Sequence, residues 1–133
     1  MNGIIVYWSG TGNTEAIANK ISSDTLYEAL SVSSLKPEDL EKYDIVVFGC
    51  PAMGAEELEE DEFKPFFEEA MNYLSGKKLA LFGSYGWGDG EWMRNWKDEA
   101  IALGGDVVST IIANGDDSAL DSNEYSEFLT KIQ

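Results

Sequence analysis

Three glycine-rich segments of this sequence contain residues that could bind a phosphorylated ligand. The first consists of Ser9, Gly10, Thr11, Gly12, Asn13 and Thr14. It follows an apolar run and opens a helical pattern, so its backbone N–H groups and the positive end of the helix would form a phosphate site. The two glycines permit close approach of the backbone, and the three hydroxyl groups add hydrogen-bond donors.

The first segment has no lysine or arginine, and this restricts the classes of phosphate ligand that it could bind. A P-loop would require a Gly-Lys-Ser/Thr sequence, and a dinucleotide fingerprint would require a third glycine. Neither pattern is present. We therefore predict that this loop binds a terminal phosphate monoester through neutral donors.

The second segment begins with a cysteine and consists of Cys50, Pro51, Ala52, Met53, Gly54, Ala55, Glu56 and Glu57. A cysteine after a strand raises the question of tyrosine-phosphatase chemistry, which needs a thiolate and an arginine that clamps the phosphoryl group. Glu56 stands where that arginine would be, and a carboxylate there would raise the pKa of the thiol. We therefore reject this chemistry and predict that Cys50 is a small buried hydrophobic residue.

The third segment places two aromatic residues among four glycines: Gly83, Ser84, Tyr85, Gly86, Trp87, Gly88, Asp89 and Gly90. A tryptophan between glycines in a polar loop is unusual for a core position. We expect the Trp87 ring to be exposed, with free backbone N–H groups beside it. Such an arrangement suits stacking on a flat ligand with polar edges.

The elements that position these segments alternate between strands and helices. Four nearly continuous apolar runs predict strands that are buried on both faces, and a weaker run predicts a fifth. The predicted strands are Gly3–Trp8, Leu26–Val32, Asp44–Cys50, Lys78–Tyr85 and Asp106–Ala113, and the helices are Thr14–Ile21, Pro37–Tyr43, Glu62–Leu74, Glu91–Leu103 and a last helix capped by Asp121 with Glu124 as its capping-box partner. This order predicts an α/β fold, a doubly wound five-stranded parallel sheet with helices on both faces, in one domain over residues 1–133. Ligands of such sheets bind beyond the carboxyl ends of the strands, where the three segments lie.

The charge of the chain excludes one class of partner and favours another. Lys and Arg number 9 against 25 Asp and Glu, which gives a net charge of −16. Nucleic acid would be repelled, whereas proteins with basic faces would be attracted. We expect no leader sequence, and the chain has no apolar run long enough to cross a bilayer and only one cysteine. We expect a cytoplasmic monomer with no membrane or nucleic-acid partner.

Three strings of residues resemble the short-chain flavodoxins of anaerobic bacteria, and the likeness covers nearly the whole chain in order and spacing. These are Ile5-Val6-Tyr7-Trp8-Ser9-Gly10-Thr11-Gly12-Asn13-Thr14-Glu15, Gly49-Cys50-Pro51-Ala52-Met53-Gly54 and Leu81-Phe82-Gly83-Ser84-Tyr85-Gly86-Trp87-Gly88-Asp89-Gly90-Glu91-Trp92-Met93. The resemblance implies a flavodoxin-like fold and one non-covalent FMN. Relatives often have a longer first helix, so the helix predicted over Thr14–Ile21 looks shortened.

The resemblance also implies a role for each loop. Ser9–Thr14 would wrap the FMN phosphate, and Met53 and Trp87 would sandwich the isoalloxazine ring. Glu56 would accept a hydrogen bond from the flavin N3–H, and the Gly54 peptide would turn to offer its carbonyl to N5–H after the first electron. Backbone N–H groups near Gly86, Trp87 and Gly88 would face N1 and O2. The remaining cofactor-binding residues in this assignment are Pro51, Ala52, Ser84, Tyr85 and Asp89.

The implied function is a low-potential one-electron carrier, which shuttles between the semiquinone and hydroquinone of FMN and is not an enzyme. A glycine at position 54 lowers the cost of a peptide flip, and acidic surroundings disfavour the anionic hydroquinone. Two alternatives stay open: an FMN-dependent quinone reductase, and a flavodoxin-like activator of a partner enzyme. A phospho-receiver domain is disfavoured because the acid pair and lysine that it needs are missing.

Overall fold

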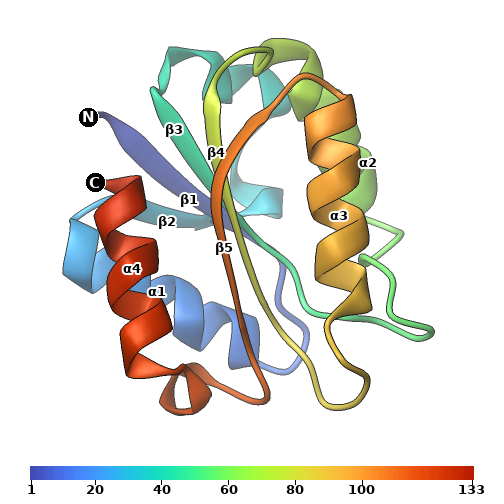
Figure 1. The fold of residues 1–133 in the computed structure, drawn as a ribbon. Coiled ribbons are helices and arrows are strands. Elements are labelled where there is room, and N and C mark those ends of the chain that lie inside the picture. Colours follow the sequence, from blue (N-terminus) through green and yellow to red (C-terminus); the bar gives the residue numbers. More distant parts are fainter.

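The fold is a five-stranded, wholly parallel sheet in the order β2-β1-β3-β4-β5, described by a computed structural model of residues 1–133 (Figure 1). The strands are β1 (Gly3–Tyr7), β2 (Glu28–Ser31), β3 (Ile45–Gly49), β4 (Lys78–Ser84) and β5 (Asp106–Ala113). Each lies within the run that predicted it. The central strands β1 and β3 are buried at every position, as their continuous apolar sequences indicate. The predicted doubly wound parallel sheet is thereby confirmed.

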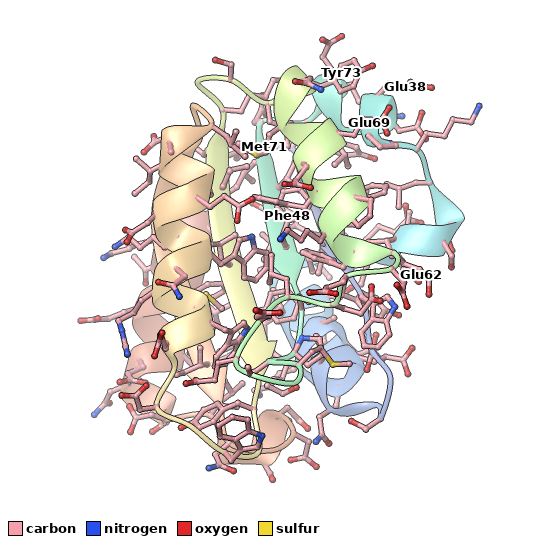
Figure 2. All side chains as sticks on the ribbon, turned by 90° about the vertical axis from the view of Figure 1, so that its right-hand side faces the viewer. Glu38, Phe48, Glu62, Glu69, Met71 and Tyr73 are labelled. Atoms are coloured by element: carbon pink, nitrogen blue, oxygen red, sulfur yellow. The ribbon has the colours of Figure 1, made fainter.

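Two pairs of helices cover the two faces of the sheet. Figure 1 shows α1 (Asn13–Thr25) and α4 (Ser122–Ile132) on one side, and α2 (Phe63–Ala70) and α3 (Glu91–Ala102) on the other. Each pair encloses its own cluster of buried residues, one of 20 under α2 and α3 and one of 14 under α1 and α4. The first cluster contains edge-to-face aromatic pairs, such as Phe48 with Phe67 and Phe63 with Trp96. Phe48, on β3, is labelled in Figure 2.

Short 3₁₀ helices connect several of these elements. They are η1 (Val32–Ser34), η2 (Pro37–Lys42), η3 (Met71–Tyr73) and η4 (Asp117–Ala119). The helix predicted over Pro37–Tyr43 thus forms as the tighter 3₁₀ type. The helix predicted over Glu62–Leu74 divides into α2 and η3, because its last turn tightens before Leu74.

The prediction of a shortened first helix is wrong, because α1 continues four residues beyond Ile21 to Thr25. One of the polar residues that suggested an end, Asp24, is held by a bond to another helix and by a pair within its own helix. Asp24 accepts a hydrogen bond of 2.7 Å from the hydroxyl of Tyr125 on α4, and it lies 3.9 Å from the ammonium of Lys20. The helix ends only where Leu26 turns to φ +67° and donates its N–H to the carbonyl of Ser22.

The N-cap predicted for the last helix is confirmed. The Asp121 carboxylate accepts hydrogen bonds from the N–H groups of Asn123 and Glu124, at 3.1 and 3.0 Å. The side chain of Glu124 returns no bond to the Asp121 N–H, so the capping box is only half formed. No helix of the protein has the length and apolar composition that crossing a membrane would require.

Candidate functional site

A cleft of about 340 Å³ opens at the carboxyl ends of the strands, where the three glycine-rich loops meet. Four segments that are far apart in the sequence line it. These are Trp8, Gly10, Thr11 and Asn13 after β1, Pro51, Ala52 and Met53 after β3, Ser84, Tyr85 and Gly86 at the end of β4, and Asn114 and Gly115 after β5. The location agrees with the rule that ligands of doubly wound sheets bind at this edge. Nine of the seventeen predicted cofactor-binding residues therefore border one cavity.

The loop between β1 and α1 is shaped around a single hydroxyl group. The Ser9 Oγ accepts hydrogen bonds from the N–H groups of Gly12 and Glu15, at 3.1 and 3.3 Å. Gly12 lies at φ +98°, a conformation that favours glycine, and it forms the N-cap of α1. Ser9 accepts both bonds, so its own hydroxyl hydrogen is free for a ligand.

Four backbone N–H groups of this loop have no acceptor within the protein, those of Gly10, Thr11, Asn13 and Thr14. The last two belong to the first turn of α1, whose dipole adds partial positive charge. No lysine or arginine lines the cleft. The loop thus offers what a phosphate group needs at a helix N-terminus, with neutral donors only.

Two hydroxyl groups connect the first loop to the end of β4. The Thr14 and Ser84 oxygens lie 2.8 Å apart, and both side chains are buried. Only one of them can donate in this bond, so one hydroxyl hydrogen remains. Thr14 therefore fixes α1 against the central sheet as well as standing beside the cleft.

The loop after β3 is closed into a tight turn by two backbone hydrogen bonds. Met53 and Glu57 exchange them, at 2.8 and 2.9 Å. Between them Gly54 lies at φ +49° and Glu56 at φ +56°. The turn presents the half-exposed Met53 side chain to the cleft, while Gly54 and Glu56 lie outside its lining.

Glu56 joins this turn to the start of α3. Its Oε1 accepts hydrogen bonds from the N–H groups of Gly90 and Glu91, at 3.2 and 3.1 Å. A carboxylate at a helix N-terminus is favourably placed against the helix dipole. The second carboxylate oxygen is left available, as a hydrogen bond from a ligand N–H would require.

The loop between β4 and α3 carries an exposed indole. Trp87 is 64% exposed, whereas Trp92 and Trp96 of α3 are each 1% exposed. Backbone N–H groups of Gly86, Trp87 and Gly88 donate no bond within the protein. The exposed ring and the free N–H groups agree with the sequence prediction, although Trp87 and Gly88 stand beyond the cleft lining.

Asp89, the last predicted residue of this loop, lies outside the cleft lining and is paired with Arg94. Its carboxylate oxygen lies 3.1 Å from the guanidinium of Arg94, and its carbonyl accepts from the same side chain. The pair is exposed, so it contributes little to stability. The pair nevertheless engages Arg94, which is the only arginine of the chain.

Cys50 is buried and chemically quiet, as predicted. Burial is the main reason that the pKa of its thiol is raised to about 12. The Glu59 N–H donates a hydrogen bond to the sulfur and lowers the pKa, whereas the negative charge of the Glu59 carboxylate raises it. The sequence argument gave Glu56 as the cause, but burial is the larger effect and Glu59 is the neighbouring carboxylate. A thiol of this pKa is not ionised near neutral pH, which excludes thiolate catalysis.

Three residues that line the cleft were not among the cofactor-binding residues predicted from the sequence: Trp8, Asn114 and Gly115. Trp8 closes one wall, and its ring is so near Gly10 that a Cβ there would lie 3.0 Å from it. Its Nε1 donates to the Glu62 Oε1 at 3.2 Å, at the start of α2 where Figure 2 labels Glu62. Asn114 and Gly115 follow β5 directly. The carboxyl-end rule applies to that strand too and could have found them.

The strand order 2-1-3-4-5, with a cleft beyond the carboxyl ends of the strands, defines the doubly wound class of α/β proteins that bind ligands at the point where the strand order reverses. The family model described as flavodoxin matches residues 5–128. The flavodoxin of Megasphaera elsdenii is 46% identical over 133 residues, which are 96% of this chain and 97% of the relative. The flavodoxin of Clostridium beijerinckii is 48% identical over 135 residues, 96% of each chain.

A solved structure agrees with these relatives. The solution structure of two-electron reduced Megasphaera elsdenii flavodoxin has a TM-score of 0.87 and 44% identity, over 97% of this chain and 98% of that one. The chain belongs to the flavodoxin family. Flavodoxins are FMN-based electron-transfer proteins, and the predicted cofactor, FMN, is confirmed at this level.

The residues of this chain fit FMN. The free N–H groups of the first loop match a phosphate monoester, and the exposed Trp87 and Met53 side chains match a flat ring. Glu56 keeps one carboxylate oxygen for a ring N–H.

Proposed function

We propose that this protein is a low-potential one-electron carrier that works on the semiquinone–hydroquinone couple of FMN and has no substrate of its own to convert. The observation that carries the proposal is the set of four unpaired N–H groups in a loop without basic residues, together with an exposed indole in another loop at the same edge of the sheet. FMN supplies the redox chemistry, and the protein binds, orients and tunes it.

The assignment of residues to the cofactor is part of this proposal. The loop Ser9–Thr14 binds the phosphate, and Met53 and Trp87 flank the ring. Glu56 accepts from N3–H with the oxygen that the N-terminus of α3 leaves free. Backbone N–H groups of Gly86–Gly88 donate to the pyrimidine edge, and Gly54 provides the peptide that responds to reduction. Pro51, Ala52, Ser84, Tyr85 and Asp89 complete the enclosure.

The electrostatics of the site support a low potential. The cleft contains no lysine or arginine, and the only arginine of the chain, Arg94, is paired with Asp89. The whole chain carries −16 charges. Adding a negative charge to a ring in these surroundings is unfavourable, so the second electron should be accepted only at low potential.

The partners in this proposal are redox proteins with basic faces. The protein itself is a cytoplasmic monomer in this proposal. The acidic surface attracts such faces and repels nucleic acid. Two assays separate the alternatives raised by the sequence. Steady-state oxidation of NAD(P)H with quinones would reveal a quinone reductase, and capture of one stoichiometric enzyme on the purified protein would reveal a dedicated activator.

A titration of the apoprotein with FMN and with riboflavin tests the phosphate assignment. Riboflavin lacks only the phosphate, so it is the matched control. If the phosphate accepts two or more charge-assisted hydrogen bonds of about 1.5–3 kcal/mol each, FMN should bind at least about 100-fold more tightly than riboflavin. Equal affinity for both ligands would show that the loop Ser9–Thr14 is not a phosphate site. The visible spectrum of freshly purified protein reports independently whether a flavin is bound.

A further inference from the structure

The segment that follows β5 contains an asparagine directly before a glycine, Asn114 and Gly115. Both residues line the cofactor cleft, yet the proposed assignment of residues to FMN uses neither of them. The segment lies at the lower end of the sheet in Figure 1, just after Ala113, whose carbonyl accepts a hydrogen bond of 3.0 Å from Tyr85. A chemically labile pair of residues thus stands at a wall of the proposed site.

An asparagine before a glycine can cyclise and lose its carboxamide. The backbone nitrogen of the glycine attacks the carboxamide carbon, ammonia leaves, and a succinimide ring forms. Water then opens the ring at either carbonyl and leaves aspartate or isoaspartate, so the net change is the gain of one water molecule and the loss of one ammonia. The reaction needs a free backbone N–H and a flexible residue after the asparagine, and glycine is the most flexible residue.

The structure meets both requirements at Asn114. The Asn114 side chain is exposed, and the N–H group of Gly115 donates no hydrogen bond within the protein. Gly115 lies at φ +125°, and a Cβ built on it would have only Ala119 within 4 Å, at 3.8 Å. No contact with the rest of the chain therefore fixes or crowds the nitrogen that must attack.

The chain contains one other asparagine–glycine pair, Asn2 and Gly3, and the fold protects it. Gly3 is the first residue of β1 and is buried, and the carbonyl of Asn2 accepts hydrogen bonds from the N–H groups of Asp44 and Ile45. A Cβ built on Gly3 would lie 2.7 Å from the ring of Tyr27, so the backbone has no room to rearrange. The same pair of residues is therefore free to react at one place and locked at the other.

We propose that Asn114 is a site of spontaneous deamidation, and that the reaction places a carboxylate in the cleft and weakens the binding of FMN. Thr11 and Asn13 of the phosphate loop line the same cleft, so the new charge and the phosphate of FMN share one cavity and repel each other. No lysine or arginine lines the cleft to compensate the added charge. Bound FMN covers the segment, so the apoprotein is the form that changes with age. The effect on FMN rests on the proposed function, whereas the deamidation itself does not.

The test ages the apoprotein and the FMN complex in mildly alkaline buffer and follows both asparagines by peptide mass mapping, with enzymatic methylation to identify isoaspartate. Cyclisation at Asn2 must first break several strand hydrogen bonds, so we expect Asn114 to convert at least about tenfold faster. With FMN at about ten times its dissociation constant, roughly a tenth of the chains stay free. Conversion at Asn114 should then slow about tenfold, while conversion at Asn2 stays unchanged.

Two variants separate the added charge from other effects of ageing. Asn114→Gln keeps a carboxamide but would need a larger ring to cyclise, so it should retain its initial FMN affinity throughout. Asn114→Asp carries the charge of the product from the start, and it should bind FMN about tenfold less tightly, the scale of a like charge in the same cleft.

The outcomes that contradict the proposal differ for its two parts. Equal conversion at Asn114 and Asn2, or none at Asn114, would overturn the modification site. Wild-type FMN affinity in Asn114→Asp would overturn the effect on the cleft. If fresh apoprotein bound no FMN, the proposed function would fail, while the mass measurements would still decide whether Asn114 deamidates.

Discussion

Gly54 is held at φ +49° inside the turn that Met53 and Glu57 close, and a Cβ built on it would meet no atom within 4 Å. The cost of a side chain here is therefore conformational rather than steric. For an L-residue the left-handed region costs roughly 1–2 kcal/mol, most for β-branched side chains and least for Asn. This makes Gly54→Val and Gly54→Asn a matched pair of variants.

For Gly54→Val we expect the two one-electron potentials to move toward each other, because valine resists the turn that a reorienting peptide must reach. In Gly54→Asn the difference between the two potentials should stay closer to the wild-type value. Two measurements are needed: a reductive titration that gives both one-electron potentials, and the dissociation constant of FMN from the oxidised protein. If valine lowered the affinity equally in all redox states and left the gap unchanged, Gly54 would be part of a fixed turn only.

Trp87→Ala should weaken FMN binding and leave the thermal stability of the apoprotein nearly unchanged. The ring is 64% exposed, so its removal leaves no core cavity. Stacking on the cofactor is worth about 0.5–1.5 kcal/mol beyond area burial. Apoprotein melting and FMN titration check both parts. A variant that melts earlier but binds FMN normally would assign Trp87 to packing.

At the scale of elements, α2 depends on a buried carboxylate just before its first turn. Glu59 is 6% exposed and accepts hydrogen bonds from the N–H groups of Asp61, Glu62 and Phe63, at 2.8, 2.8 and 2.7 Å. Burial alone would raise the pKa of this carboxyl, but the three N–H groups hold it below its usual value. These bonds also support the segment that carries Glu56, Glu57 and Glu60.

Glu59→Gln should destabilise the protein by about 1–3 kcal/mol, since it removes charge-assisted bonds to buried N–H groups. Asp121→Asn, at the exposed cap of α4, should cost less. The folded-state pKa of Glu59 is depressed, so its contribution is present above the unfolded-state pKa and is lost as pH falls through the folded-state pKa. Urea unfolding of both variants near neutral pH and in acid measures this. Equal losses that do not vary with pH would contradict it.

The elements also show where a sequence is sufficient to predict structure. The strands were predictable because burial on both faces makes their sequences continuously apolar. The last turn of α1 was not, because the bonds of Asp24 to Tyr125 and Lys20 replace local propensity, and the first of these is a tertiary contact. The three loops around the cleft followed from their glycine spacing. Asn114 and Gly115 were missed because the loop after β5 was not considered.

At the scale of the whole molecule, the charge of −16 acts on anything that approaches the site. The carboxylates Glu56, Glu57 and Glu60 form a concentrated part of that charge next to the proposed cofactor loops. A field of this kind raises encounter rates with cations and lowers them with anions. Its range is about 10 Å at 0.1 M ionic strength and about 3 Å at 1 M, so the effect must depend on salt.

We therefore expect reduction by the methyl viologen radical, a cation, to slow as ionic strength rises from about 0.01 to 1 M, because the Debye length falls roughly tenfold over that range. The matched control is a sulfonated viologen without net positive charge, whose rate should stay level or rise. Stopped-flow measurement on the holoprotein follows the loss of the viologen radical. The two reagents share a redox core, so a difference in salt dependence isolates the charge. If both rates stayed flat, the acidic surface would have no steering role and would serve solubility alone.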